Sequence, residues 1–154
     1  MKADTRLFGK IDVADDKVIK IKEGIIGYPN FVNFTLIHDE EKKKKGGIRW
    51  LQSLDDGAFA LPVVDPLEIV PEYKPTVGKE ALKLLGDMPT ESAFILVTIT
   101  VPKEIEQMSV NLKAPFIINM ENLQGVQLII EDNYPVKYKI YDILQKKKAG
   151  VQTC

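Results

Sequence analysis

Few side chains in this sequence have the chemistry of an active site. His38 is the only histidine, so no second histidine can complete a metal site or an acid–base pair with it. Cys154 is the only cysteine and the last residue, where a mobile thiol is a poor nucleophile and no internal disulfide can form. The sequence also lacks the glycine-rich phosphate-binding motifs and the Gly-x-Ser-x-Gly motif of hydrolases. We therefore expect no enzyme and no cofactor.

Acidic side chains are the one chemical feature that is concentrated in the chain. The stretch Trp50–Tyr73 contains five acids and no lysine or arginine: Asp55, Asp56, Asp65, Glu68 and Glu72. The first two belong to an Asp-Asp-Gly turn, whose chemistry accounts for them. A divalent cation requires several oxygens that converge in one loop, and this pattern does not supply them, so we predict no metal site.

The acids that follow the turn suggest a surface for a basic protein partner. Prolines at positions 66, 71 and 75 favour an extended, exposed segment, in which Leu67, Ile69, Val70 and Tyr73 are candidate apolar anchors. Charge would steer such a partner and apolar contacts would hold it. The alternative is that the acids only face water. The predicted partner-binding residues are Asp65, Leu67, Glu68, Ile69 and Glu72.

The overall charge gives no sign of nucleic-acid binding. The chain has 21 Lys+Arg and 22 Asp+Glu, a formal net charge of -1, whereas non-specific binding depends on neutralising phosphates. The run Lys42–Lys45 follows three acids and has no interleaved aromatic residues, which favours a solvated loop. We expect no direct nucleic-acid binding, with RNA binding through this loop as the alternative.

The elements that must position these residues are mostly strands. Glycines and prolines are spread evenly between short apolar runs, and no regular alternation of strands and helices occurs, so a parallel sheet is not expected. We predict a mostly β fold, a compact antiparallel β-barrel-like single domain. The expected strands are Thr5–Gly9, Ile11–Val13, Val18–Lys22, Phe31–His38, Ile48–Leu54, Ala58–Val64, Ala93–Val101, Met108–Leu112, Pro115–Met120, Gly125–Glu131 and Tyr134–Ile140.

One short helix is expected among these strands, over Thr76–Gly86. Thr76 can cap its start, Gly86 can end it, and Ala81, Leu82 and Leu85 share one face. The run Ala93–Val101 is apolar or β-branched throughout, which is typical of a strand buried on both faces.

The length of 154 residues is that of one domain. We predict a single domain over residues 1–144 and a flexible tail over 145–154. The first residues lack a signal-peptide core, and no apolar run reaches the ~18 residues of a membrane span. We therefore expect a cytoplasmic protein without membrane contact.

Four motifs together resemble the FliW family of bacterial flagellar assembly factors. The first is Glu23-Gly24-Ile25-Ile26-Gly27-Tyr28, and the second is Trp50-Leu51-Gln52-Ser53-Leu54 followed by Ala58 to Pro66. The third is Asn111-Leu112-Lys113-Ala114-Pro115-Phe116-Ile117-Ile118-Asn119, and Gly125 to Leu128 with Tyr134-Pro135-Val136 completes the order. The resemblance covers about residues 3 to 141.

We expect structural roles for the residues of these motifs: Gly24, Gly27, Trp50, Gln52, Ser53, Pro66, Asn111, Pro115 and Asn119. Trp50 is expected in the core. At least one of Gln52 and Ser53 should face solvent or a partner, because they are adjacent polar residues in a strand. The two asparagines should bond the backbone of turns.

The resemblance implies a β-barrel-like fold that works by binding and has no catalytic activity. It implies two partners, the translational regulator CsrA and flagellin, and an exchange between them that relieves repression of flagellin mRNA. We expect a monomer. Whether antagonism of the regulator is competitive or allosteric is left open by the sequence. The alternative to the resemblance is a small-ligand-binding β-barrel with acids around a cavity mouth.

Overall fold

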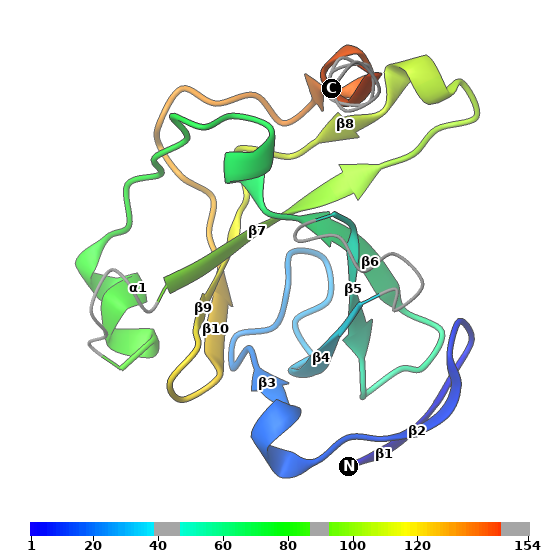
Figure 1. Cartoon of the computed structure of the whole chain (residues 1–154). Helices are drawn as coiled ribbons and strands as arrows, with labels where there is room; N and C mark the ends of the chain where they lie inside the picture. Colours follow the sequence, from blue (N-terminus) through cyan, green and yellow to red (C-terminus); the bar gives the residue numbers. More distant parts are fainter. Residues whose placement is uncertain (39–46, 87–92, 146–154) are drawn as a thin grey trace, which may run out of the picture.

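The computed structural model describes residues 1–38, 47–86 and 93–145. The predictions for Lys42–Lys45 and for the tail that ends at Cys154 fall outside these residues. The described chain forms a β-barrel with the β1–β2 hairpin at one end and β8 at the other (Figure 1).

The barrel closes because strand β7 pairs on both sides. It bonds β6 in one direction and β9 in the other, so the order β7-β6-β5-β4-β3-β10-β9 returns to its start. All of these pairings are antiparallel except β3–β10, which is parallel. The predicted antiparallel β-barrel is thus confirmed. Its strands are β3 (Ile19–Lys20), β4 (Asn33–His38), β5 (Arg49–Ser53), β6 (Ala60–Val64), β7 (Ala93–Thr100), β9 (Phe116–Asn119) and β10 (Gln124–Gln127).

Shorter elements surround the barrel. The strands β1 (Lys2–Thr5) and β2 (Gly9–Asp12) form a separate hairpin, and β8 (Ser109–Val110) and β11 (Tyr138–Lys139) extend the sheet from the end of β7. The helical turns are η1 (Asp15–Lys17), η2 (Pro66–Glu68), η4 (Ile105–Gln107) and α1 (Lys79–Leu84). Residues 141–145 are also helical, so the prediction of a single helix was incomplete.

Apolar side chains fill the inside of the barrel. In each strand every second residue points inward, and these residues meet in one cluster. Phe34, Leu51, Leu96 and Phe116 are fully buried there. The barrel is therefore a packed core, which does not support the alternative of an interior ligand cavity.

The outward residues of the barrel are covered by the surrounding elements. Helix α1 places Ala81 and Leu85 on Ile117 and Val126 of β9 and β10. Residues after β6 pack with β8 and β11 on the outer face of β7, where Val97 is fully buried. The sequence predicts that strand β7 is buried on both faces along its whole length, and this prediction was wrong at both ends. Ala93 to Ile95 are half-buried, and Val101 is 56% exposed beyond the end of the strand.

Two further boundaries differ from the prediction. Helix α1 starts after Gly78, which gives no side-chain cap, and the Thr76 hydroxyl instead donates to Asp132 at 2.8 Å. Gly86 ends the helix as predicted, with φ +82°. The strand expected over Val18–Lys22 is reduced to the two residues of β3, because the chain before it forms η1 and the chain after it turns at Gly24.

Candidate functional site

The acidic segment after β6 is held in a defined shape from its first residue. The carboxylate of Asp65 accepts a hydrogen bond from the Leu67 backbone N–H at 2.9 Å and so caps η2. Pro66 is the first residue of η2, where its missing N–H costs nothing. Asp65 therefore shapes the segment, as well as contributing charge to its surface.

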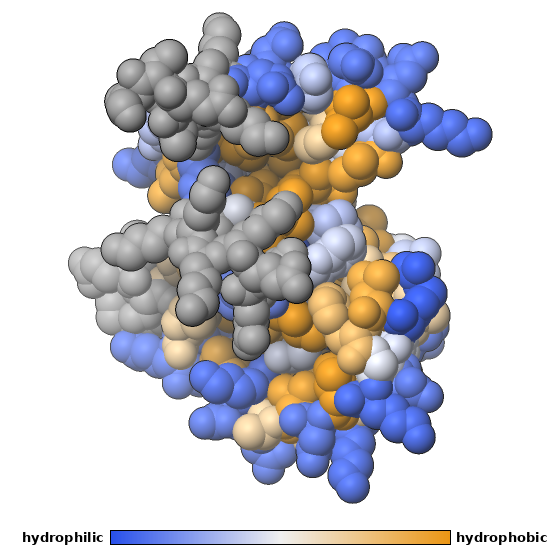
Figure 2. Space-filling view, turned by 45° about the vertical axis from the view of Figure 1, so that its right-hand side comes forward, coloured by the Kyte–Doolittle hydropathy of each residue, from blue (hydrophilic) through white to orange (hydrophobic). Residues whose placement is uncertain are grey.

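A hydrogen bond joins η2 to the start of β5. Oε2 of Glu68 accepts from the Gly47 backbone N–H at 3.1 Å. Each of the two joined segments presents an exposed apolar side chain, Leu67 at 49% and Ile48 at 46%. The molecular surface shows such apolar patches between charged side chains (Figure 2). We call Ile48, Asp65, Leu67, Glu68 and Glu72 the η2 surface.

Three of the expected apolar anchors are not on this surface. Ile69 is only 7% exposed, and Val70 and Tyr73 are also buried, because they pack on the outer face of β7. Ile69 therefore lacks the exposure on which its prediction as a partner-binding residue was based. Of the predicted binding residues, η2 brings together Asp65, Leu67 and Glu68, while Glu72 is exposed further along the segment.

The far end of the segment is anchored by Tyr73. Its hydroxyl donates to the Leu112 carbonyl at 2.7 Å, and its ring packs edge-on against Tyr134 with 4.6 Å between centroids. Burial, together with the nearby Tyr134 and Asp132, raises the pKa of the Tyr73 hydroxyl. Tyr73 therefore stays protonated and serves as a hydrogen-bond donor.

Asp132 fixes the chain beyond this point. Its carboxylate accepts from the backbone N–H of Thr76 at 3.0 Å and from its hydroxyl at 2.8 Å. The hydrogen bond from the Thr76 backbone N–H is the main cause that holds the pKa of Asp132 below its usual value. The hydrogen bond from the Thr76 hydroxyl adds to this effect. The segment that carries the η2 surface is thus tied down at both ends.

Three residues of the second motif, Trp50, Gln52 and Ser53, differ in burial from the sequence prediction. Trp50 is half-buried on the outer face of β5 and is not a core residue, because its neighbour Leu51 is the one that points inward. Gln52 and Ser53 are both fully buried, so neither faces solvent. The Gln52 amide donates to the carbonyls of Ser53, Gly57 and Phe59, and the Ser53 hydroxyl accepts from the N–H groups of Asp55 and Asp56.

The other motif residues have structural positions. Gly24 has φ +72°, and a side chain there would collide with the Pro29 backbone, whereas Gly27 at φ +86° faces open space. Oδ1 of Asn111 accepts from Lys113 and Ala114 N–H groups, and Asn119 bonds the Leu85 carbonyl and the Glu121 N–H. The remaining two motif residues, Pro66 and Pro115, are both buried. Both asparagines thus bond turn backbone groups.

Catalytic and metal chemistry find no support in the described part of the chain. His38 lies exposed at the end of β4, paired with Arg49 of β5. Residues 1–38, 47–86 and 93–145 contain no cluster of three metal-binding side chains. Among the same residues no helix is long and apolar enough to cross a membrane.

One surface feature is not predicted from the sequence. A groove of about 1110 Å³ lies where β3 ends, between β4, η1 and the β9–β10 turn. In the register of β3 on β4, the residues opposite Leu36 to His38 are Asp15 to Lys17, which form η1 instead of continuing β3. The signal in the sequence is Asp15-Asp16-Lys17, a turn-forming triplet directly before the expected strand.

Comparison with known proteins gives a consistent result. The family model described as FliW protein matches residues 2–140. The flagellar assembly factor FliW of Lachnospira eligens is 41% identical over 150 residues, which cover 96% of this chain and 99% of that protein. That of Thermotoga neapolitana is 34% identical and covers 93% of this chain and 95% of its own length. A crystal structure of the flagellar assembly factor FliW matches the fold with a TM-score of 0.82 and 24% identity, covering 92% of this chain and 97% of that chain.

Proposed function

Since this chain belongs to the FliW family, we propose that it is a flagellar assembly factor that acts by binding two proteins, CsrA and flagellin, and not by catalysis. Free flagellin occupies the protein and leaves the regulator free to repress translation of flagellin mRNA. Once flagellin is exported, the protein binds the regulator and relieves repression. The protein works in the cytoplasm as a monomer, through a single domain over residues 1–144, and does not bind RNA itself.

The η2 surface is the observation that supports a binding role most directly. Leu67 and Ile48 are exposed apolar side chains beside the carboxylates of Asp65 and Glu68. The segment is tied at Asp65 and at Tyr73, so little conformational entropy remains to be lost on binding. Apolar anchors with acids around them suit a small basic partner such as CsrA. We therefore assign the regulator to this surface.

Charge reversal on the η2 surface tests this assignment. The double variant Glu68→Lys and Glu72→Lys should bind the regulator about tenfold or more weakly, since rim charges slow association and desolvated ones speed dissociation. Calorimetric titration of the regulator into wild type and variant gives the affinities. Melting temperature is the control for folding.

A matched variant separates local from overall charge effects. Glu104 and Glu106 are exposed on the β7–β8 loop, so Glu104→Lys with Glu106→Lys changes the net charge by the same amount. This control should bind the regulator as wild type does. If the η2 variant keeps wild-type affinity, the regulator binds elsewhere on the barrel. If flagellin is affected equally, the two partners share the η2 surface.

A further inference from the structure

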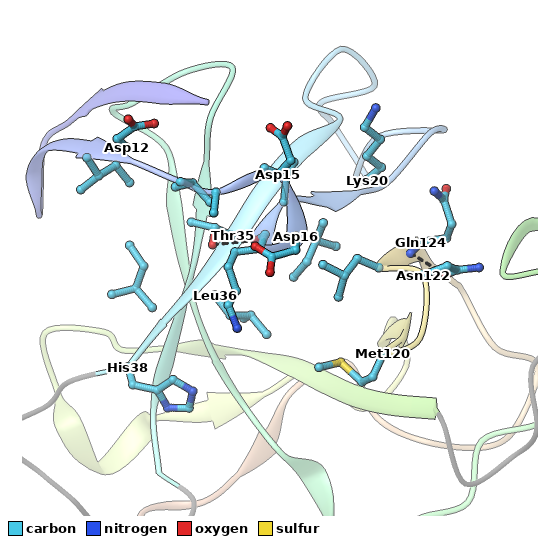
Figure 3. A pocket seen from close by; sticks show the side chains of 18 of the residues that line it. Asp12, Asp15, Asp16, Lys20, Thr35, Leu36, His38, Met120, Asn122 and Gln124 are labelled. Atoms are coloured by element: carbon cyan, nitrogen blue, oxygen red, sulfur yellow. Dashed lines mark hydrogen bonds between the residues drawn. The ribbon is translucent and has the colours of Figure 1, made fainter.

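The groove beside β4 is bordered by a strand edge that has no partner strand within the part of the chain that the structure describes. Strand β3 pairs with β4 only at Ile19–Phe34 and Lys20–Asn33. Before Ile19 the chain leaves the sheet and forms η1. The second half of β4, from Thr35 to His38, therefore continues beyond the end of its neighbour (Figure 3).

The hydrogen bonds at the start of β4 define which backbone groups face the groove. The Asn33 carbonyl accepts from Leu54 on the β5 side, and the Val32 carbonyl accepts from Ile21 on the β3 side, each at 2.8 Å. In an antiparallel ladder successive residues alternate between the two sides. The backbone N–H and C=O of Leu36 and His38 thus point into the groove. Within residues 1–38, 47–86 and 93–145 no hydrogen bond to these groups is formed.

The walls of the groove offer apolar contacts on both sides of this edge. Ile37 and Leu36 of β4 are half-buried, and Met120 on the opposite wall is 50% exposed. Figure 3 shows Met120 across the groove from His38, with Leu36 on the same strand as His38. The space between β4 and the β9–β10 turn corresponds to the missing continuation of β3.

The charge around the groove favours a basic occupant. Four acids line it, Asp12, Asp15, Asp16 and Glu121, against Lys17 and Lys20, and of these acids Asp12 is paired with the N-terminal ammonium group at 3.5 Å. Asp16 extends over the middle of the groove beside Leu36, whereas Lys20 points away from it (Figure 3). A lysine or arginine on a segment lying along β4 would therefore meet a carboxylate.

We propose that this groove binds an extended, lysine- or arginine-containing segment of another protein as an additional strand along β4. Backbone hydrogen bonds to Leu36 and His38 give affinity, and the apolar walls and Asp16 select the side chains. At about 3.3 Å per residue the free edge accommodates three or four residues, so the affinity of an isolated segment is modest. The groove is separate from the η2 surface and does not depend on the function proposed for it.

A synthetic hexapeptide of alternating lysine and valine is the probe. It is titrated into the ¹⁵N-labelled full chain while the backbone amide signals are followed by NMR. We expect saturable shifts at the amides of Leu36, His38 and Met120. The peptide with glutamate in place of lysine, and the peptide N-methylated at alternate residues, should each bind at least about tenfold more weakly.

Two pairs of variants locate the site. Asp16→Lys should weaken binding about fivefold, while Glu104→Lys, at an exposed position of the β7–β8 loop, should leave it unchanged. His38→Pro removes one backbone N–H that faces the groove, and proline is tolerated at such an edge position. This variant should therefore weaken peptide binding, whereas His38→Ala, which keeps the N–H, should not. Melting temperatures of all four variants control for folding.

Four results would overturn the proposal. They are the absence of saturable shifts, shifts confined to other amides, equal binding of the N-methylated peptide, and slow hydrogen exchange of the Leu36 and His38 amides without peptide. The last would mean that another part of this chain already covers the edge. None of these results bears on binding at the η2 surface, so failure here leaves the proposed function intact.

Discussion

Individual polar side chains hold the loops of this barrel, and Asp55, which follows β5, does so by bonding the start of β4, about twenty residues earlier in the chain. Its carboxylate accepts from the backbone N–H of Val32 at 2.7 Å and of Asn33 at 2.8 Å, and from the Asn33 amide at 3.0 Å. From the sequence alone, Asp55 is expected only to form its own turn. The turn chemistry could be predicted from Asp-Asp-Gly, but the long-range bonds to β4 could not.

These bonds make the stability of the protein depend on the charge of Asp55. Burial acts to raise the pKa of this carboxyl, but the hydrogen bonds from Asn33 and Val32 outweigh it and lower the pKa below the ordinary 3.8. The stabilisation is therefore complete above pH 4 or so and is lost as the pH falls through the lowered value.

The variant Asp55→Asn should reduce the free energy of unfolding by about 1 kcal/mol at pH 7, because a neutral amide accepts more weakly than a carboxylate. Urea unfolding of both proteins between pH 2 and pH 7 measures the difference. The gap should narrow at the acid end. A gap that stays constant with pH would show that the charge of Asp55 contributes nothing.

At the level of elements, the strands were predictable and their ends were not. Apolar runs between turn residues located β4, β5 and β6 to within two residues, and Asp55-Asp56-Gly57 correctly predicted the hairpin between the last two. The length of β3 depends on η1 and on the turn at Gly24, which compete locally with strand pairing. The periodicity of apolar residues cannot predict whether a turn or a strand pairing prevails at such a position.

The burial of the segment that follows η2 also differs from the sequence prediction. Prolines at both ends favoured an exposed segment for Ile69 to Tyr73. The outer face of β7 carries Val97 and Ile99, which need cover, and the segment supplies Ile69, Val70 and Tyr73 for that purpose. The side on which an irregular segment packs is set by tertiary contacts, so only the exposure of Leu67, Glu72 and their charged neighbours could be foreseen.

Helix α1 owes its position to Leu85. This side chain is fully buried against Ile117 and Val126, and its carbonyl accepts from Asn119 at 2.6 Å and from Asn122 at 3.2 Å. Leu85→Ala should lower the free energy of unfolding by about 2–4 kcal/mol, because it removes buried methyl groups and leaves a cavity. Lys83→Ala, at an exposed position of the same helix, should change it by less than about 0.5 kcal/mol. Equal effects in urea unfolding would show that α1 is not packed on the barrel.

The whole molecule combines a packed barrel with two separate candidate surfaces. The family and the barrel were predictable because four motifs occur in the right order over nearly the whole chain, and the FliW family model matches residues 2–140. The η2 surface was predictable in part, from its charge. The groove was not, since it arises where η1 takes the place of a strand before Ile19 and brings together residues from three distant parts of the chain.

The central claim is that one protein exchanges two partners, and a competition titration tests it most directly. The CsrA regulator is titrated calorimetrically into the wild-type protein alone and into the protein saturated with flagellin. The account predicts saturable binding of the regulator to the free protein and a clearly lower apparent affinity when flagellin is present. No binding of the regulator to the free protein, or the same affinity with and without flagellin, would contradict it.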